Sequence, residues 1–139
     1  MPHNYLAIIV AAVLQFIFAA IWYTVIFGKA WGTIHGFEKH SKAEQEKMQQ
    51  GMMPLLVAQF VITAVTTYVL ALFLNGLSSE WHAFGVAGFV WLGFVLPTQI
   101  SAVIFGGTNP KWMVKKIAIM AGSALGCLMT AAAVLHFMR

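Results

Sequence analysis

The residues best suited to binding a metal ion are three histidines and a carboxylate near the ends of apolar segments. Histidine nitrogens and carboxylate oxygens bind zinc and other transition metals, and histidine also changes charge near neutral pH. No short spacing typical of a metal site connects the four residues, which share only one predicted side of a membrane. The simpler interpretation is that they mark the membrane interface, so we predict no metal site and no cofactor. These weak candidates are His3, Glu80, His82 and His136.

Motifs of known enzyme classes are missing from the sequence. It contains no nucleophile elbow, phosphate-binding loop or zinc-protease motif, and no acid, base and nucleophile that would converge. The apolar segments also lack Asp, Glu, Lys and Arg, whereas carboxylate-coupled transporters place an ionised residue inside the membrane. We therefore expect a protein that is not an enzyme and not a carboxylate-coupled antiporter. The sequence does not exclude a protein that conducts water, a neutral solute or an anion passively.

The composition is that of an integral membrane protein. Of the 139 residues, 60% are hydrophobic and only 9% are charged, against about a quarter in soluble domains. We predict one all-α transmembrane domain over residues 1–139, an antiparallel four-helix bundle whose third helix is kinked at Pro97. The first apolar run is longer than the apolar region of a signal peptide and follows no basic segment. We therefore interpret it as a membrane helix that is retained rather than cleaved off. The predicted helices span about 5–27, 52–74, 83–105 and 111–137.

The lysines lie in the connections and predict the orientation. Four lie within 28–51 and three within 106–116, whereas Arg139 stands alone at the other face. By the positive-inside rule both termini face out and the two basic connections face the cytoplasm, as expected for a multi-pass membrane protein. Ser41 and Glu44 match a capping box, so a short surface helix is expected over about 42–50, ended by Gly51. The net charge of +4 follows from this topology, and no nucleic-acid partner is expected.

Small and polar residues recur at every fourth position in the first and fourth helices. Such stripes let helix backbones approach, and a buried amide such as Gln15 can hydrogen-bond to a neighbouring helix. Gly122 and Gly126 form a GxxxG motif, which serves packing either within the bundle or between copies. The predicted helix-packing residues are Gln15, Ala19, Ala118, Gly122, Gly126 and Thr130.

A second set of residues could line a pore or cavity. The stripe of the second helix is the more polar one, and Pro97 frees the carbonyl of Gly93 because it has no N–H group. The polar side chains just after Pro97 could satisfy that carbonyl or bond to another helix. The simpler interpretation is a tolerated kink in a packed helix. The possible lining residues are Gln59, Thr63, Thr67, Gly93, Pro97, Gln99 and Ser101.

Two strings of the sequence resemble a known family. The resemblance covers most of the chain in order and spacing, and points to the small bacterial four-helix membrane proteins called domain of unknown function 1761. It implies four helices and a bacterial envelope protein, and implies no activity or catalytic residue. The strings are Trp22-Tyr23 with Phe27-Gly28-Lys29-Ala30-Trp31, and Trp91-Leu92-Gly93-Phe94-Val95 with Val103-Ile104-Phe105.

The leading hypothesis is a non-enzymatic membrane protein that works as a homo-oligomer or as a subunit of a larger membrane complex. It is favoured by stripes of small and polar groups with no buried charge. Two alternatives remain. One is a channel or passive transporter for a small solute, and the other is a metal- or pH-responsive membrane protein. In each case the expected surroundings are the lipid bilayer and other membrane subunits.

Overall fold

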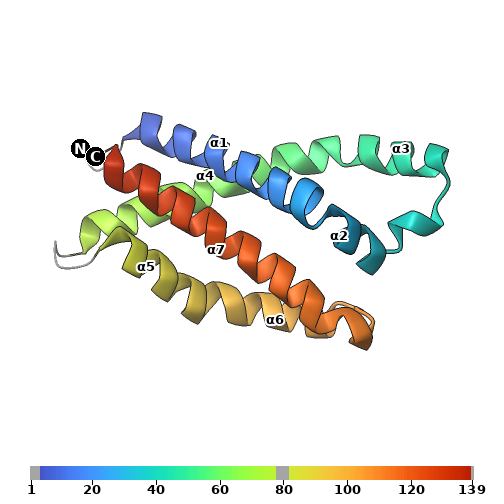
Figure 1. Ribbon diagram of the computed structural model, residues 1–139. Coiled ribbons are helices and arrows are strands. Elements are labelled where there is room, and N and C mark those ends of the chain that lie inside the picture. Colours follow the sequence, from blue (N-terminus) through green and yellow to red (C-terminus); the bar gives the residue numbers. More distant parts are fainter. Residues whose placement is uncertain (1–3, 78–81, 139) are drawn as a thin grey trace.

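The computed structural model describes residues 4–77 and 82–138, which are helical almost throughout (Figure 1). Four helical stretches are long and apolar enough to cross a membrane, as the sequence predicts. Such stretches close their own backbone hydrogen bonds, as lipid requires. The described part of the chain is therefore that of a small multi-pass membrane protein. The four stretches are Tyr5–Ile26, Lys42–Gly76, Ala83–Phe105 and Pro110–Phe137.

The first span begins at an amide cap and ends in a wider turn. Asn4 accepts a hydrogen bond from the Ala7 N–H at 3.1 Å and starts α1 (Tyr5–Ile21). A π-helical segment (Trp22–Ile26) follows, and then α2 (Gly28–Ile34). α2 lies within the connection between the first two predicted helices, over residues for which the sequence predicts no helix.

The second span is longer than expected. The polar helix α3 (Lys42–Gly51) passes directly into α4 (Met53–Gly76), because Met52 keeps a right-handed helical backbone. α3 ends at Gly51, as the sequence predicts, but α4 begins only one residue later, so no loop separates the polar helix from the second span. The combined 35 residues measure about 50 Å at the helical rise, more than the hydrocarbon core of a bilayer, about 30 Å thick. If α4 crosses a membrane, α3 projects from it into water.

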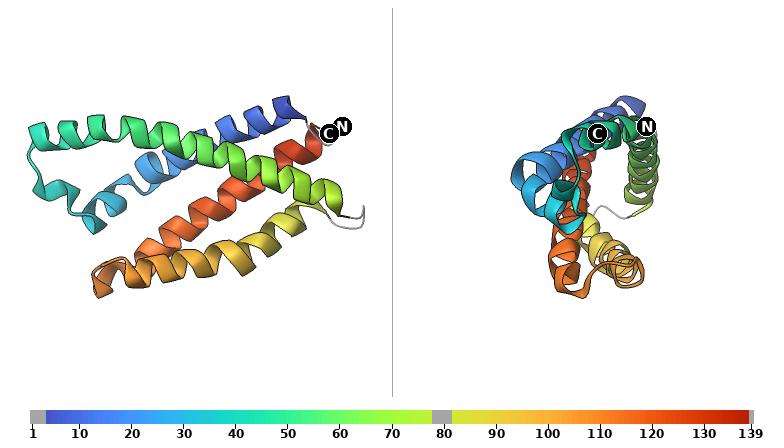
Figure 2. Two further views of the ribbon diagram at one scale, coloured as in Figure 1. Left: turned by 180° about the vertical axis from the view of Figure 1, so that it is seen from behind. Right: turned by 90° about the vertical axis from the view of Figure 1, so that its right-hand side faces the viewer.

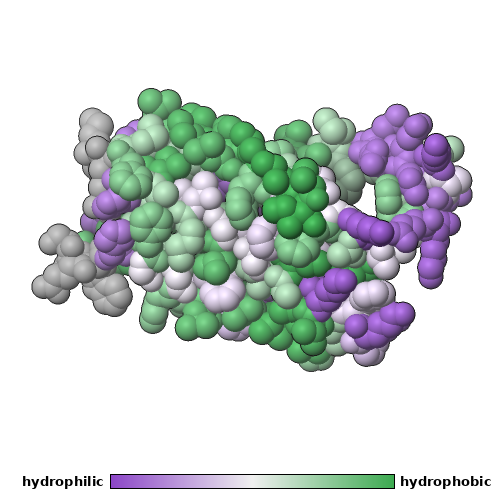
Figure 3. Space-filling view, in the orientation of Figure 1, coloured by the Kyte–Doolittle hydropathy of each residue, from purple (hydrophilic) through white to green (hydrophobic). Residues whose placement is uncertain are grey.

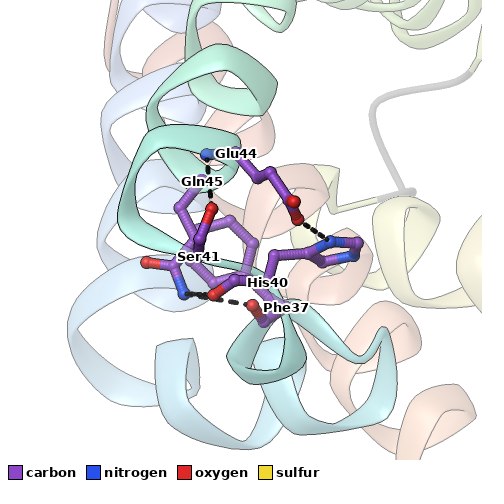
Figure 4. A network of polar contacts seen from close by, with 5 residues as sticks. All are labelled: Phe37, His40, Ser41, Glu44 and Gln45. Atoms are coloured by element: carbon purple, nitrogen blue, oxygen red, sulfur yellow. Dashed lines mark hydrogen bonds and ion pairs between the residues drawn. The ribbon is translucent and has the colours of Figure 1, made fainter.

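A capping network starts α3 (Figure 4). Ser41 Oγ accepts from the Glu44 N–H at 3.3 Å, which is one half of the expected capping box. The other half is absent, since the Glu44 carboxylate instead pairs with His40 Nδ1 at 2.9 Å. Gln45 Nε2 donates to the carbonyls of Phe37 and His40. The connection before α3 is thus held by its own side chains.

The third span contains a π-helical segment ahead of its proline. It comprises α5 (Ala83–Val90), the segment Trp91–Val95 and α6 (Leu96–Phe105). The Leu96 N–H donates to the Trp91 carbonyl, five residues back. The Thr98 hydroxyl donates to the Phe94 carbonyl, as side chains near a membrane proline often do.

The last helix is the centre of the bundle. After a 3₁₀ turn (Pro110–Trp112) capped by Asn109, α7 (Met113–Phe137) packs against α1, α5 and α6, and α1 packs against α4. Within the most apolar 18-residue stretch of each span, 39% of the residues are buried in the last span. Only 6% are buried in the corresponding stretch of Ala83–Phe105. The helices converge at the end that holds both termini and spread apart towards the other end (Figures 1 and 2).

Candidate functional site

A polar contact joins α1 to α4 inside the bundle. Gln15 is 4% exposed, and its Nε2 donates to Thr67 Oγ1 at 2.7 Å and to the Ala11 carbonyl at 3.1 Å. Thr67 is 1% exposed and donates in turn to the Thr63 carbonyl at 2.7 Å. A buried amide without partners is costly, so these bonds fix the rotation of the two helices. Thr67 therefore belongs to a helix contact and lines no cavity.

The same contact continues to α7 through weaker groups. Cys127 Sγ donates to the Gln15 carbonyl at 3.6 Å. Ser123 is buried and lies within side-chain hydrogen-bonding reach of Tyr23 and Cys127. All these groups are uncharged, and each has a neighbour to bond. The arrangement can hold the helices together through hydrogen bonds between uncharged groups.

The GxxxG glycines of α7 lie beneath two aromatic rings of the first span. A Cβ on Gly122 would lie 2.7 Å from the Trp22 ring, and one on Gly126 would overlap the Phe18 ring. The rings of Phe18 and Trp22 stack with centroids 5.7 Å apart, one helical turn from each other. The glycines thus make room for α1 within the same chain.

The other predicted packing residues lie differently. Ala118 is exposed. Ala19 is half-buried. The Thr130 hydroxyl donates to the Gly126 carbonyl of its own helix at 2.8 Å and forms no bond between helices.

Two tryptophans that sequence reasoning did not single out for packing bind α7 from either side. Trp22 Nε1 donates to the Ile119 carbonyl at 2.9 Å, and Trp91 Nε1 donates to the Ala121 carbonyl at 2.8 Å. Each tryptophan is the first residue of a π-helical segment. π-Helical turns are rare and often mark functional positions. Both bonds end on backbone carbonyls, so no sequence pattern marks this contact.

The possible pore-lining residues do not surround one cavity. Gln59 is exposed on α4, which packs on α1, whereas Gly93, Pro97 and Ser101 are exposed on the span that packs on α7. Only Gln99 combines partial burial with an unsatisfied group, because its Oε1 atom is buried without a hydrogen-bond partner.

Two of the three histidines predicted at the outer face, His82 and His136, lie next to each other in the structure. The rings of His82 and His136 have centroids 4.9 Å apart, and His82 Nδ1 accepts from the Phe84 N–H at 3.3 Å. A neutral His82 ring then carries its proton on Nε2, which opposes a metal at that nitrogen. His3 and Glu80 lie outside the described residues. Across residues 4–77 and 82–138, no three His, Cys, Asp or Glu side chains could hold one ion.

Comparison with known proteins identifies a family but no better-understood relative. Neither the curated proteins nor the solved structures gave a match. A family model described as "Protein of unknown function (DUF1761)" matches residues 6–136, which is nearly the whole chain and confirms the resemblance seen in the sequence. The chain, a bundle of four apolar helical spans joined by a buried polar network, therefore belongs to the DUF1761 family.

Proposed function

We propose that this protein is a non-enzymatic structural subunit that assembles with further copies of itself in a bacterial inner membrane. In this proposal the four spans are antiparallel, and both termini face out. The basic connections then lie in the cytoplasm, in line with the positive-inside rule. The same proposal extends to a larger membrane complex, in which other subunits would contact the same surfaces of this chain. Support comes from polar side chains that lack adequate partners within the chain.

The observation that carries the proposal is a pair of amides without adequate partners on the outer spans. Gln59 is exposed, and its Nε2 reaches only Thr63 Oγ1, at 3.5 Å. Gln99 Oε1 is buried without a partner. Gln59 lies in the first half of α4, and Gln99 lies in the second half of the third span, so both lie in the half of the bundle nearer the basic connections.

In the proposed contact the Gln99 side chain, whose Oε1 is buried in the single chain, rotates outward and accepts a hydrogen bond from the Gln59 amide of a second copy. The two residues lie at a similar depth in their spans. Unpaired polar groups cost several kcal/mol in hydrocarbon, and hydrogen bonds between membrane helices each contribute roughly 0.6–2 kcal/mol. Contact between α4 of one chain and α6 of the next would also cover two spans that this chain leaves largely uncovered.

Native mass spectrometry and crosslinking in mild detergent test the proposal. We expect the wild-type protein to be oligomeric and the Q59L/Q99L variant to shift towards monomer. The matched control is Q49L/Q50L, which makes the same two changes on exposed α3 and should leave assembly unchanged. A wild-type protein that is only monomeric and brings no partner with it would refute the proposal. Full assembly of Q59L/Q99L would refute the interface.

A pore between copies is the second candidate. Gln59 and Thr63 are linked on one face of α4, where the Thr63 hydroxyl also donates to the Gln59 carbonyl at 2.8 Å. A ring of copies that presented these faces to one another would enclose polar groups. Flux of water, a neutral solute or an anion into liposomes should then fall in Gln59→Leu and Thr63→Leu. Absence of wild-type flux for all three would remove this candidate.

A further inference from the structure

The lysines at the start of the last span lie against aromatic rings. Lys111 Nζ lies 5.0 Å and Lys115 Nζ 5.7 Å from the ring centroid of Trp112. Lys116 Nζ lies 5.9 Å from the ring of Trp31, which belongs to α2. Cation–π attraction holds an ammonium group near a ring face while leaving its N–H donors available. We call these five residues the basic collar.

The lysines of the collar have no acidic partner in the described part of the chain. The one ion pair found there joins His40 to Glu44, and Glu38 instead accepts from the Thr33 hydroxyl. The first turn of the last span contains no acidic residue either. Cations at the start of a helix oppose its dipole, so their charge is not compensated from within the helix. Three neighbouring positive charges thus remain open to an external anion.

Exposed apolar side chains lie beside the collar in the sequence. Phe105 at the end of α6 is 88% exposed, and Val114 within the last span is 81% exposed. Figure 3 shows hydrophilic atoms next to strongly apolar surface at this end of the bundle, where α6 turns into α7. Tryptophan prefers the headgroup level of a bilayer. The collar therefore combines positive charge with tryptophans of the kind that lie at the headgroup level. The exposed apolar side chains beside it offer a surface for acyl chains.

We propose that the basic collar binds an anionic phospholipid, with Lys111, Lys115 and Lys116 donating to the headgroup phosphate. The acyl chains lie along the exposed apolar surface next to Phe105 and Val114. Clustered lysines beside membrane helices attract anionic lipids in this way. This interaction is independent of the oligomer proposed above, because it uses neither Gln59 nor Gln99.

Lipid competition measured by native mass spectrometry tests the proposal. The full-length protein is equilibrated in detergent with equal amounts of dioleoyl phosphatidylglycerol and dioleoyl phosphatidylcholine. We expect selective retention of phosphatidylglycerol, a loss of that selectivity of roughly tenfold or more in K111Q/K115Q/K116Q, and a decline with added salt. The matched control K39Q/K42Q/K47Q removes three charges from the connection and α3, and it should keep the selectivity.

Four outcomes would overturn the proposal. They are equal retention of both lipids by the wild-type protein, insensitivity of the wild-type preference to salt, equal loss in both triple variants, and displacement of phosphatidylglycerol by soluble glycerophosphate at matching concentration. The last result would reveal a site for free phosphate. The salt series uses only the wild-type protein, so a variant that fails to fold leaves the proposal testable.

Discussion

Phe18 of α1 lies directly over Gly126 of α7, so closely that a methyl group on this glycine would overlap the ring. The contact explains why a GxxxG motif occurs in the last span without requiring a second copy. It also makes the motif testable as a feature of folding within one chain.

Gly126→Ala should destabilise the fold by about 1–3 kcal/mol, because overpacking forces the ring or the helix to move. Unfolding from mixed micelles with increasing SDS measures the change. Gly85→Ala is the matched control, because nothing lies within 4 Å of its added methyl group. It should be neutral or stabilising, since alanine favours helices over glycine.

A smaller side chain at Phe18 should relieve this overlap. The Phe18→Leu change alone loses apolar packing, yet the double variant with Gly126→Ala should be less destabilised than the sum of the two single variants. Strict additivity would mean that the two residues do not meet in the folded protein.

The Gln15–Thr67 bond should contribute about 0.6–1.7 kcal/mol, the range measured for bonds between membrane helices. A double-mutant cycle with Q15L and T67V isolates this coupling in the same unfolding assay. Thr66→Val is the control, because Thr66 is exposed and its hydroxyl bonds only to the Ile62 carbonyl. A coupling energy indistinguishable from zero would contradict the network.

The histidine pair should not retain a transition metal through purification. His82 Nδ1 is occupied by the Phe84 N–H, so a metal at Nε2 would require the cap of α5 to open. Elemental analysis of untagged protein should find less than one zinc, copper or nickel ion per ten chains. One ion per chain that is lost in both His82→Ala and His136→Ala would overturn the prediction.

The orientation can be measured by cysteine labelling in whole cells. With Cys127 replaced by Ser, a cysteine at Asn4 should react with an impermeant maleimide added from outside, and a cysteine at Lys42 should react only after lysis. Both positions are exposed in the structure. The reverse pattern would show that the lysine distribution does not set the topology of this chain.

The sequence sufficed to predict the four spans because lipid leaves an apolar backbone few choices. Their charge-free length indicated helices directly. Two features of the connection were not predicted. Gly28 begins the further helix α2, and α3, which ends at Gly51 as expected, is followed by α4 after a single residue. A glycine costs a helix only about 1 kcal/mol, so flanking turns can continue through it.

The partners within the bundle were harder to predict. Gln15 was expected to bond to a neighbouring helix, but Gln59, Thr63 and Thr67 share one stripe of α4, and periodicity cannot choose among them. The choice of Thr67 depends on the relative rotation and height of α1 and α4, which depend on every other contact. The hydrogen bonds of Trp22 and Trp91 could not be predicted either, because their acceptors are backbone carbonyls, which every residue carries.

The absence of a loop between α3 and α4 has a mechanical consequence. A flexible loop would absorb a force applied to α3. Two helices joined only through Met52, which keeps a helical backbone, transmit that force to α4. With α4 held by α1 near Thr67, a small tilt at that pivot swings the distant tip of α3 through a much wider arc. The second span is therefore shaped as a lever, with α3 as the arm that lies farthest from Thr67.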